Sequence, residues 1–376
     1  MPDAVLHAMS VQPMDLGDPR VDANIAAVEQ GLRRLLHSET AEVFLYACNG
    51  HGVWEAVVEN LAAPGQAVLI AGTGHFSESW AVQTEALGRR VLRTPWREGW
   101  PIDADALEQA LRDDRAHEIQ AVFVVHTDTA SGVTSDLGRI RRALDAAQHP
   151  ALLVADVVAS LAAAPFAMDS LGVDVSVGAS QKGLMCPPGV GFVAINDKAL
   201  AAAQRNPAPR FYWDWLRRKD AMSYRKFCGT PPQNLLFGLE AALELIFREG
   251  LSAVWARHAR LAGAVHAAIE GWREGGAVNF FAQQPQSRSV SVTTIAVTPG
   301  AVENETLLEV ARERFQVAMA GGLGPLTGRA FHIGHLGDCN PAMILGAIGG
   351  AEAALRTLGV PVGEGVQRAV KFLAAE

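Results

Sequence analysis

The sequence predicts an α/β protein in which a large domain with a mostly parallel sheet is followed by a smaller α+β domain. Between residues 40 and 195, short apolar runs alternate with stretches of helical spacing, which is the pattern of a parallel sheet covered by helices on both faces. The last hundred residues hold separate strand and helix candidates instead. A chain of 376 residues, 49% hydrophobic and 19% charged, is long and apolar enough to form two cores.

Five apolar runs in the first half predict buried strands, because β-branched and other apolar residues follow one another there without polar interruption. These runs are residues 43–47, 67–70, 121–125, 152–154 and 191–195. Between them, apolar residues recur three and four positions apart, which predicts amphipathic helices. The predicted helices are residues 52–61, 103–112 and 137–147.

The second half predicts a different arrangement. A segment rich in aromatic residues and arginine, 207–225, interrupts the alternation and leads into a long helical region at about 234–273. After it come strand candidates at 289–297 and 330–333 and helix candidates at 305–315 and 343–358. We therefore expect an N-terminal arm and the large domain in residues 1–255, and the small domain in residues 256–376.

Charge and cysteine usage narrow the classes of partner. The formal net charge is −8, and no cluster of Lys and Arg marks a nucleic-acid or membrane surface. No apolar run approaches the ~20 residues of a membrane helix. The first residues have neither the basic n-region nor the apolar h-region of a signal peptide. The four cysteines lack CxxC spacing and predict reduced thiols. We expect a cytoplasmic protein without metal, nucleic-acid or membrane partners.

Lys182 and Asp156 are the residues that indicate a chemistry. Lys182 lies between an apolar run and a glycine-bearing turn, where desolvation would lower the amine pKa and make it a Schiff-base nucleophile. Asp156 ends the apolar run 151–155, and ligands bind at the carboxyl ends of strands in open α/β sheets. A lysine for the aldehyde and an aspartate for the pyridinium nitrogen together indicate pyridoxal 5′-phosphate (PLP).

Three further groups follow predicted strands and so belong to the same edge of the sheet. Asn49, Gly50 and His51 precede a helix whose N-terminus suits a phosphate, although Asn49 is also a good helix N-cap. Phe76 has the flat shape to cover one face of a cofactor ring, or it packs as an ordinary aromatic. The segment 126–133, which contains Thr129, offers hydroxyl groups to a cofactor or forms a polar turn.

Several segments resemble the class V, fold-type I PLP aminotransferases, and within them the serine–glyoxylate and alanine–glyoxylate branch. The similar segments run nearly from end to end. They are Ala155-Asp156-Val157-Val158-Ala159-Ser160-Leu161, Met168-Asp169-Ser170-Leu171-Gly172-Val173-Asp174-Val175, Ser180-Gln181-Lys182-Gly183-Leu184-Met185-Cys186-Pro187-Pro188-Gly189, Gly50-His51 with Trp54-Glu55-Ala56, Gly132-Val133-Thr134-Ser135-Asp136, Ala256-Arg257-His258 and Ile333-Gly334-His335-Leu336-Gly337-Asp338.

The resemblance implies a mostly parallel seven-stranded sheet, a homodimer with shared active sites, and a role for each matching residue. Lys182 would carry the Schiff base and move the substrate α-proton, while Asp156 would keep the pyridine nitrogen protonated. The implied cofactor contacts are Asn49, Gly50, His51 and Gln181 to the phosphate, Phe76 and Val158 on the two faces of the ring, Thr129 at its polar edge, and Thr230 to the phosphate of the neighbouring subunit.

Two positions depart from the family pattern. His332 stands where the family has the Arg that binds the substrate α-carboxylate. The guanidinium of Arg binds a carboxylate with two parallel hydrogen bonds, and its replacement weakens carboxylate binding by roughly 1.5–3 kcal/mol. We expect His332 to face the substrate in its place, since Arg329 falls on the opposite side of a strand. Near the start, a family Pro-Gly-Pro segment has no counterpart before residue 2, and Leu16-Gly17 replace a His-Arg pair.

The predicted function is transfer of an amino group from a small L-amino acid to glyoxylate or another small 2-oxo acid. Serine is the favoured donor, with alanine and aspartate next. A lyase of the cysteine desulfurase type is an alternative on the same fold. Phe76 at the stacking position and the lack of a cysteine in a glycine-rich loop disfavour it. A third alternative is a relative with altered substrates or no turnover, because His332 replaces the arginine.

Overall fold

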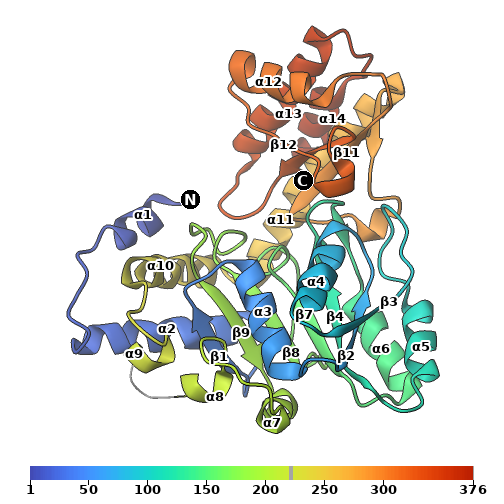
Figure 1. Cartoon of the computed structure of the whole chain (residues 1–376). Coiled ribbons are helices and arrows are strands. Elements are labelled where there is room, and N and C mark those ends of the chain that lie inside the picture. Colours follow the sequence, from blue (N-terminus) through green and yellow to red (C-terminus); the bar gives the residue numbers. More distant parts are fainter. Residues whose placement is uncertain (220–222, 376) are drawn as a thin grey trace.

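The computed structural model describes residues 1–219 and 223–375 and contains two domains (Figure 1). The large domain is built on a seven-stranded sheet, and a smaller C-terminal domain with its own four-stranded sheet stands above it. The predicted α/β class with a mostly parallel sheet and a second α+β domain is confirmed.

The order of the strands in the large sheet brings the carboxyl ends of six of them to one edge. Along the sheet lie β1 (Glu42–Tyr46), β9 (Gly191–Ile195), β8 (Val175–Ala179), β7 (Leu152–Asp156), β4 (Ile119–Val125), β2 (Ala67–Ala71) and β3 (Arg90–Arg93). β9 pairs antiparallel with both β8 and β1, while the other pairs are parallel, so β9 alone runs in the opposite direction.

Helices cover both faces of this sheet because its strands are apolar on both sides. In β4, Val122 and Val124 belong to one core cluster, while Phe123 and Val125 belong to the other, as the two-residue period of a strand requires. The first cluster also contains residues of α2 (Pro19–Leu35), α5 (Ala104–Asp113), α6 (Leu137–Ala147) and α10 (Gln233–Glu249), and the second contains residues of α3 (Gly50–Leu61), α4 (His75–Ala86) and α7 (Asp197–Arg205).

Most of the elements predicted in the first half are present within one or two residues, and α6 has the predicted bounds. The predictions did not include α2, α4 or β3. β3 carries an arginine at each end and is mostly exposed, so the apolar signal that marks the central strands is missing from it. The remaining short elements are α1 (Asp3–Met9), β5 (Thr127–Asp128), β6 (Val133–Thr134), α8 (Trp215–Arg218) and α9 (Ser223–Lys226).

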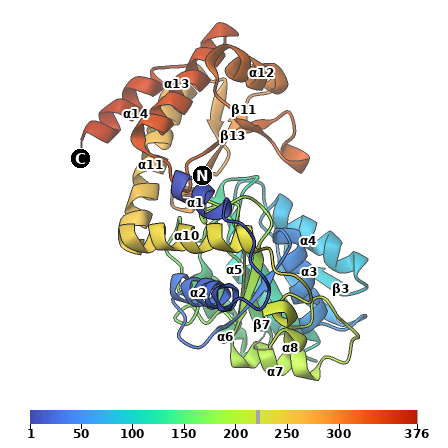
Figure 2. The ribbon, with the colours of Figure 1, turned by 90° about the vertical axis from the view of Figure 1, so that its left-hand side faces the viewer.

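The long helical region predicted at 234–273 is two helices, α10 and α11 (Leu251–Trp272), separated by Gly250. Gly250 has φ +88°, a conformation that L-residues with a side chain rarely adopt, and a Cβ there would meet no other atom within 4 Å. Glycine is therefore favoured at this position by the backbone conformation, and not by a lack of room for a side chain. Figure 2 shows the consequence: α10 lies on the large domain, and α11 turns away to enter the small domain.

The small domain packs three helices and α11 against one face of an antiparallel sheet. Its strands lie in the order β10 (Val278–Phe280), β11 (Val292–Val297), β13 (Ala330–Gly334), β12 (Ala320–Gly321), and its helices are α12 (Asn304–Phe315), α13 (Pro341–Thr357) and α14 (Gly365–Ala374). The predicted strand 289–297 begins three residues later than expected. The proposed limit between residues 255 and 256 falls within α11, and the domain limits stay a prediction.

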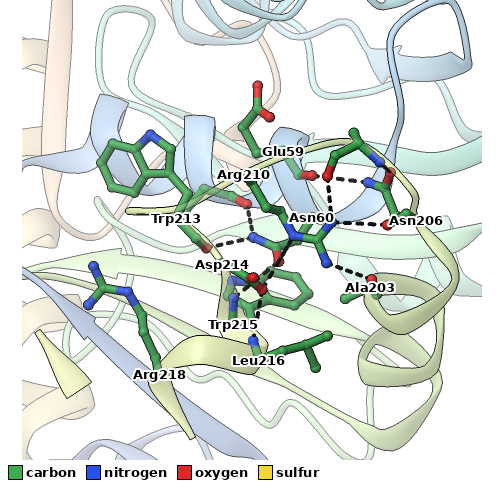
Figure 3. Close-up of polar contacts among 12 residues, drawn as sticks. Glu59, Asn60, Ala203, Asn206, Arg210, Trp213, Asp214, Trp215, Leu216 and Arg218 are labelled. Carbon is green, nitrogen blue, oxygen red and sulfur yellow. Dashed lines mark hydrogen bonds and ion pairs between the residues drawn. The ribbon is translucent and has the colours of Figure 1, made fainter. Parts of the chain in front are cut away.

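Asn60, at the end of α3, anchors the aromatic segment that interrupts the sequence pattern (Figure 3). Its buried amide donates to the carbonyls of Ala56 and Trp213, both at 2.7 Å, and its Oδ1 accepts from Arg210 Nε (3.0 Å) and from the backbone N–H of Trp215 (3.2 Å). All four hydrogen-bonding positions of the amide are used. Because α3 begins at the functional edge of the sheet, this network holds the far end of a helix whose first turn lines the site.

Candidate active site

A cavity of about 200 Å³ opens where the carboxyl ends of β1, β4, β7 and β8 meet. It is lined by Asn49, Gly50, His51, Trp54, Phe76, Val125, Thr127, Thr129, Asp156, Val158, Ala159, Gln181 and Lys182. Nine of the predicted site residues are in this lining, and they come from five different segments of the chain. Thr230 and His332, which were also predicted, are not.

Asp156, the last residue of β7, is a buried carboxylate with two protein donors. The indole Nε1 of Trp54 donates to Oδ2 (2.8 Å), and the backbone N–H of Val158 donates to Oδ1 (2.7 Å). Burial raises the pKa of Asp156 to about 6, although both hydrogen bonds and the nearby Lys182 amine act to lower it. The charged form of this desolvated carboxylate would be stabilised by a cationic N–H group bound in the cavity.

Lys182 follows β8 in the loop that runs from Ser180 to Pro187. The side chain is half-buried, and desolvation lowers its pKa, while Asp156 acts in the opposite direction. The loop is braced internally, since Ser180 Oγ donates to the carbonyl of Pro187 (2.6 Å) and the N–H of Cys186 donates to the carbonyl of Ser180 (3.0 Å). The fold thus presents an amine with a reduced proton affinity in the same cavity as a carboxylate with an increased one.

The first turn of α3 forms another wall. Asn49 is the N-cap, and its Oδ1 accepts from the N–H groups of His51 (3.1 Å) and Gly52 (3.4 Å). The capping role considered for Asn49 is therefore present. The N–H of Gly50, in the first turn, has no acceptor within its own helix. A helix N-terminus at the rim of a cavity attracts an anionic group through its free N–H groups and its dipole.

Trp54, which lines the cavity, and Asp128, which holds the backbone of the lining residue Phe76, were not singled out from the sequence. Trp54 donates to Asp156, and its ring also meets Phe76 edge-on, with 6.3 Å between the ring centroids. Asp128 is fully buried and accepts the backbone N–H groups of Phe76 (2.9 Å), Ala130 (2.9 Å) and Ser131 (3.1 Å). An Asp just after a strand also fits an ordinary turn, so the sequence carried no specific signal for this role.

The residues of the cavity fit PLP. Asp156 offers a buried anionic acceptor, Lys182 an amine with a lowered pKa, Phe76 a flat apolar wall, and the start of α3 an anion site. In addition, Oε1 of Gln181 is buried without a hydrogen-bond partner among the described residues, although the side chain lines the cavity. An unpaired buried amide oxygen is costly, and a polar group bound in the cavity would supply its partner.

Thr230 and His332 lie away from this lining. Thr230 is exposed in the loop between α9 and α10. His332 is buried in β13, where Nε2 donates to the carbonyl of Ala130 (2.8 Å) and Nδ1 faces the carbonyl of Ala320 (3.3 Å). Neither the contact of Thr230 across a dimer interface nor the binding of substrate by His332 is tested by this arrangement, and both stay predictions.

The fold and the site together place this chain among the PLP-dependent transferases of fold type I. Within that class, the family model for class V aminotransferases matches residues 18–326, and the chain belongs to this family. It is 39% identical to the serine–glyoxylate aminotransferase of Methylorubrum extorquens, covering 99% of this chain and 93% of the relative. It is 38% identical to the L-aspartate–glyoxylate aminotransferase of Paracoccus denitrificans, covering 98% and 92%. The protein is a PLP-dependent aminotransferase.

Solved structures agree with this assignment. An alanine–glyoxylate aminotransferase from Nostoc sp. superposes with a TM-score of 0.84 at 28% identity, covering 94% of this chain and 92% of that one. A cysteine desulfurase from Thermococcus onnurineus shares the fold alone, with a TM-score of 0.68 at 15% identity, covering 100% of this chain and 90% of that one.

Within residues 1–219 and 223–375, no helix is long and apolar enough to cross a membrane.

Proposed function

We propose that this aminotransferase moves an amino group from a small L-amino acid to glyoxylate or another small 2-oxo acid. Serine is the favoured donor, followed by alanine and aspartate. The observation that carries the chemistry is the meeting of Lys182 and Asp156 in one cavity, with pKa values displaced in opposite directions. The choice of substrates is supported by the names of relatives that are 38–39% identical over nearly the whole chain.

Bound PLP supplies an electron sink for the pair of electrons left when the substrate α-proton departs. Lys182 would hold the cofactor through its Nζ as a Schiff base. With Lys182 released by the substrate amine, its Nζ would be the base that takes the substrate α-proton and the acid that later gives this proton back. The lowered pKa of Lys182 favours the neutral amine that this step needs. Asp156 would pair with a protonated pyridine nitrogen, while the Trp54 indole and the Val158 backbone N–H keep its carboxylate in place.

The other cavity residues position the cofactor in this proposal. Phe76 and Val158, which line the cavity, would cover the two faces of the ring, and Thr129 would meet its polar edge. Asn49, Gly50, His51 and Gln181 of the lining would hold the phosphate. In a homodimer, Thr230 of the neighbouring subunit would also contact it. The exposure of Thr230 on its own chain is compatible with a contact to a second copy. We place the enzyme in the cytoplasm, where its four free cysteines would stay reduced.

The lyase alternative receives no support from the cavity. A desulfurase of this fold needs a cysteine that reaches the substrate sulfur, and none of the four cysteines lines the cavity. Two of them, Cys48 and Cys186, also have pKa values raised to about 12 by burial, which disfavours the thiolate. Loss of turnover, the third alternative, is decided by the activity measurement below.

The purified enzyme is expected to be yellow, and borohydride should fix the chromophore on the peptide that contains Lys182. Lys182→Ala should abolish transamination. A screen of serine, alanine and aspartate against glyoxylate and pyruvate, followed by the absorbance of the cofactor, should identify the donor and acceptor. Recovery of the reduced adduct on another lysine would refute the assignment of Lys182. A yellow enzyme whose spectrum no amino acid alters would instead indicate a relative without turnover.

A further inference from the structure

His332 and Thr294 join the small domain to the large domain at a single carbonyl oxygen. The two residues lie opposite each other on β13 and β11, so their side chains point to the same face of the small sheet. The carbonyl of Ala130 in the large domain accepts from His332 Nε2 at 2.8 Å and from Thr294 Oγ1 at 3.2 Å. All three groups are buried, so water does not compete for these bonds.

The segment that ends in this carbonyl is part of the wall of the active site. Thr129, which lines the cavity, is the residue before Ala130. Asp128 accepts the N–H of Ala130 with Oδ1 and the N–H of Phe76 with Oδ2, both at 2.9 Å. A continuous chain of hydrogen bonds therefore runs from His332 through Ala130 and Asp128 to Phe76. It connects the small domain to two of the proposed contacts of the cofactor ring.

Backbone contacts also join the two domains next to the hydrogen bond between His332 and Ala130. The N–H of Ser289 donates to the carbonyl of Gly132 (2.9 Å). Gly132 has φ +65°, and a Cβ on it would lie 3.0 Å from the backbone N of Thr294. The 128–132 segment thus packs directly on β11, and His332 on the neighbouring strand β13 makes the shortest of the polar contacts described above between this segment and the small domain.

His332 has no ring nitrogen directed toward the cavity. Nε2 is engaged by Ala130, and Nδ1 faces the carbonyl of Ala320 at 3.3 Å, so both nitrogens point at hydrogen-bond acceptors of the protein. A carboxylate also requires a donor, and to offer Nε2 the imidazole would have to give up its hydrogen bond to the buried carbonyl of Ala130, which would keep only the longer bond from Thr294.

We propose that His332 is a positioning residue that latches the small domain to the 128–132 segment and so fixes Thr129 and Phe76, instead of binding the substrate α-carboxylate. This proposal rests on the proposed function for its catalytic consequence, but the latch itself is a property of the protein alone. It follows that residue 332 does not discriminate between an amino acid and the amine that lacks its carboxylate.

The test compares His332→Leu, which removes the donor, with His332→Gln, whose terminal amide nitrogen takes about the place of Nε2. Thr294→Val removes the longer of the two bonds to Ala130. Thr298→Val is the matched control, because it removes a hydroxyl-to-carbonyl bond (2.8 Å, to Gly276) elsewhere in the small domain. Hydrogen–deuterium exchange is measured on the full-length chain, with and without PLP, at the amides of Phe76, Ala130 and Ser131, which bond to Asp128.

The latch predicts exchange about three- to tenfold faster at these three amides in His332→Leu, the range expected for loss of one buried hydrogen bond. The effect should be smaller in Thr294→Val and absent in His332→Gln and Thr298→Val. Unchanged exchange in a folded His332→Leu protein overturns the proposal. Because this measurement needs no substrate, it remains decisive even if the proposed transamination fails.

A second measurement separates a latch from a substrate ligand. The ratio of kcat/KM for L-alanine to that for ethylamine, and for L-serine to that for ethanolamine, is compared between wild type and His332→Leu. The latch predicts a lower kcat with each substrate and an unchanged ratio. A ratio that falls about tenfold or more, the loss expected for a charge-assisted hydrogen bond, would show that His332 binds the carboxylate and would overturn the proposal.

Discussion

At Asp156 the fold keeps a carboxylate among buried strand residues and gives it two donors, which is too few to compensate for its desolvation. The sequence predicted this residue and Lys182 because each follows an apolar strand, and the wall of the cavity made by Asn49, Phe76 and Thr129 was found by the same rule. Trp54 and Asp128 were not found, because they act through contacts between segments that are far apart in the chain. A side chain whose role depends on a contact with a distant segment leaves no local sequence pattern.

The raised pKa of Asp156 predicts a pH dependence of stability in the protein without PLP. Between the ordinary pKa of 3.8 and about 6, the folded state holds a proton that the unfolded state has released, so this group destabilises the fold as pH rises. The free energy of unfolding of wild type minus that of Asp156→Asn should therefore fall by about 1–3 kcal/mol from pH 4 to pH 7. Urea unfolding at several pH values measures this difference, and a constant difference would show that the carboxylate is not perturbed.

Among the elements, periodicity located helices and central strands, but it did not locate their interruptions. The pattern of apolar residues continues through Gly250, so the sequence predicted one helical region where the structure has α10 and α11. A single glycine in a helical pattern is usually tolerated, and only the tertiary requirement that the chain enter a second domain turns this one into a break. The edge strand β3 was missed for a related reason, since exposure removes the apolar pattern.

The break between α10 and α11 at Gly250 allows a matched pair of glycine substitutions, for which we expect opposite changes in the free energy of unfolding. Gly250→Ala should destabilise the protein by about 1–2 kcal/mol, because φ +88° is strained for a residue with a Cβ although the space is open. Gly346→Ala, within α13 and also with nothing within 4 Å of its Cβ, should stabilise by about 0.5–1 kcal/mol. Denaturant unfolding of the two variants beside wild type checks both. A neutral Gly250→Ala would mean that the turn does not need a positive φ.

On the scale of the whole molecule, the small domain docks on the 128–132 segment beside the active site, whose lining comes from the large domain. The sequence predicted both domains from the change in pattern after residue 195. The positions of strand ends and the resemblance to class V aminotransferases together named nine of the thirteen residues that line the cavity. The sequence did not predict how His332 packs, because the family residue at that position suggested a ligand, whereas the contact with Ala130 depends on how the domains dock. The docking of domains is set by many weak contacts and has no sequence motif.

A homodimer with shared sites predicts that two inactive variants complement each other. Lys182→Ala lacks the amine in its own site, and Thr230→Val would lack the phosphate contact that it offers to the partner's site. In a mixed dimer one site receives both intact residues, so part of the activity should return after the two are mixed and exchanged. Each variant mixed with itself is the control. If mixed dimers are detected by mass and remain inactive, Thr230 does not act across the interface.

The order of the large sheet also has a consequence for the synthesis of the protein. β1 is held in the sheet by β9, with Glu42 opposite Ile195 and Tyr46 opposite Gly191. A ribosome must therefore translate the chain as far as Ile195 before the strand that leads into Asn49 acquires its full partner. Until then β1 has an open edge, and unpaired edges are where nascent chains associate wrongly. The wall of the active site that is encoded first is completed among the last, when β9 leaves the ribosome.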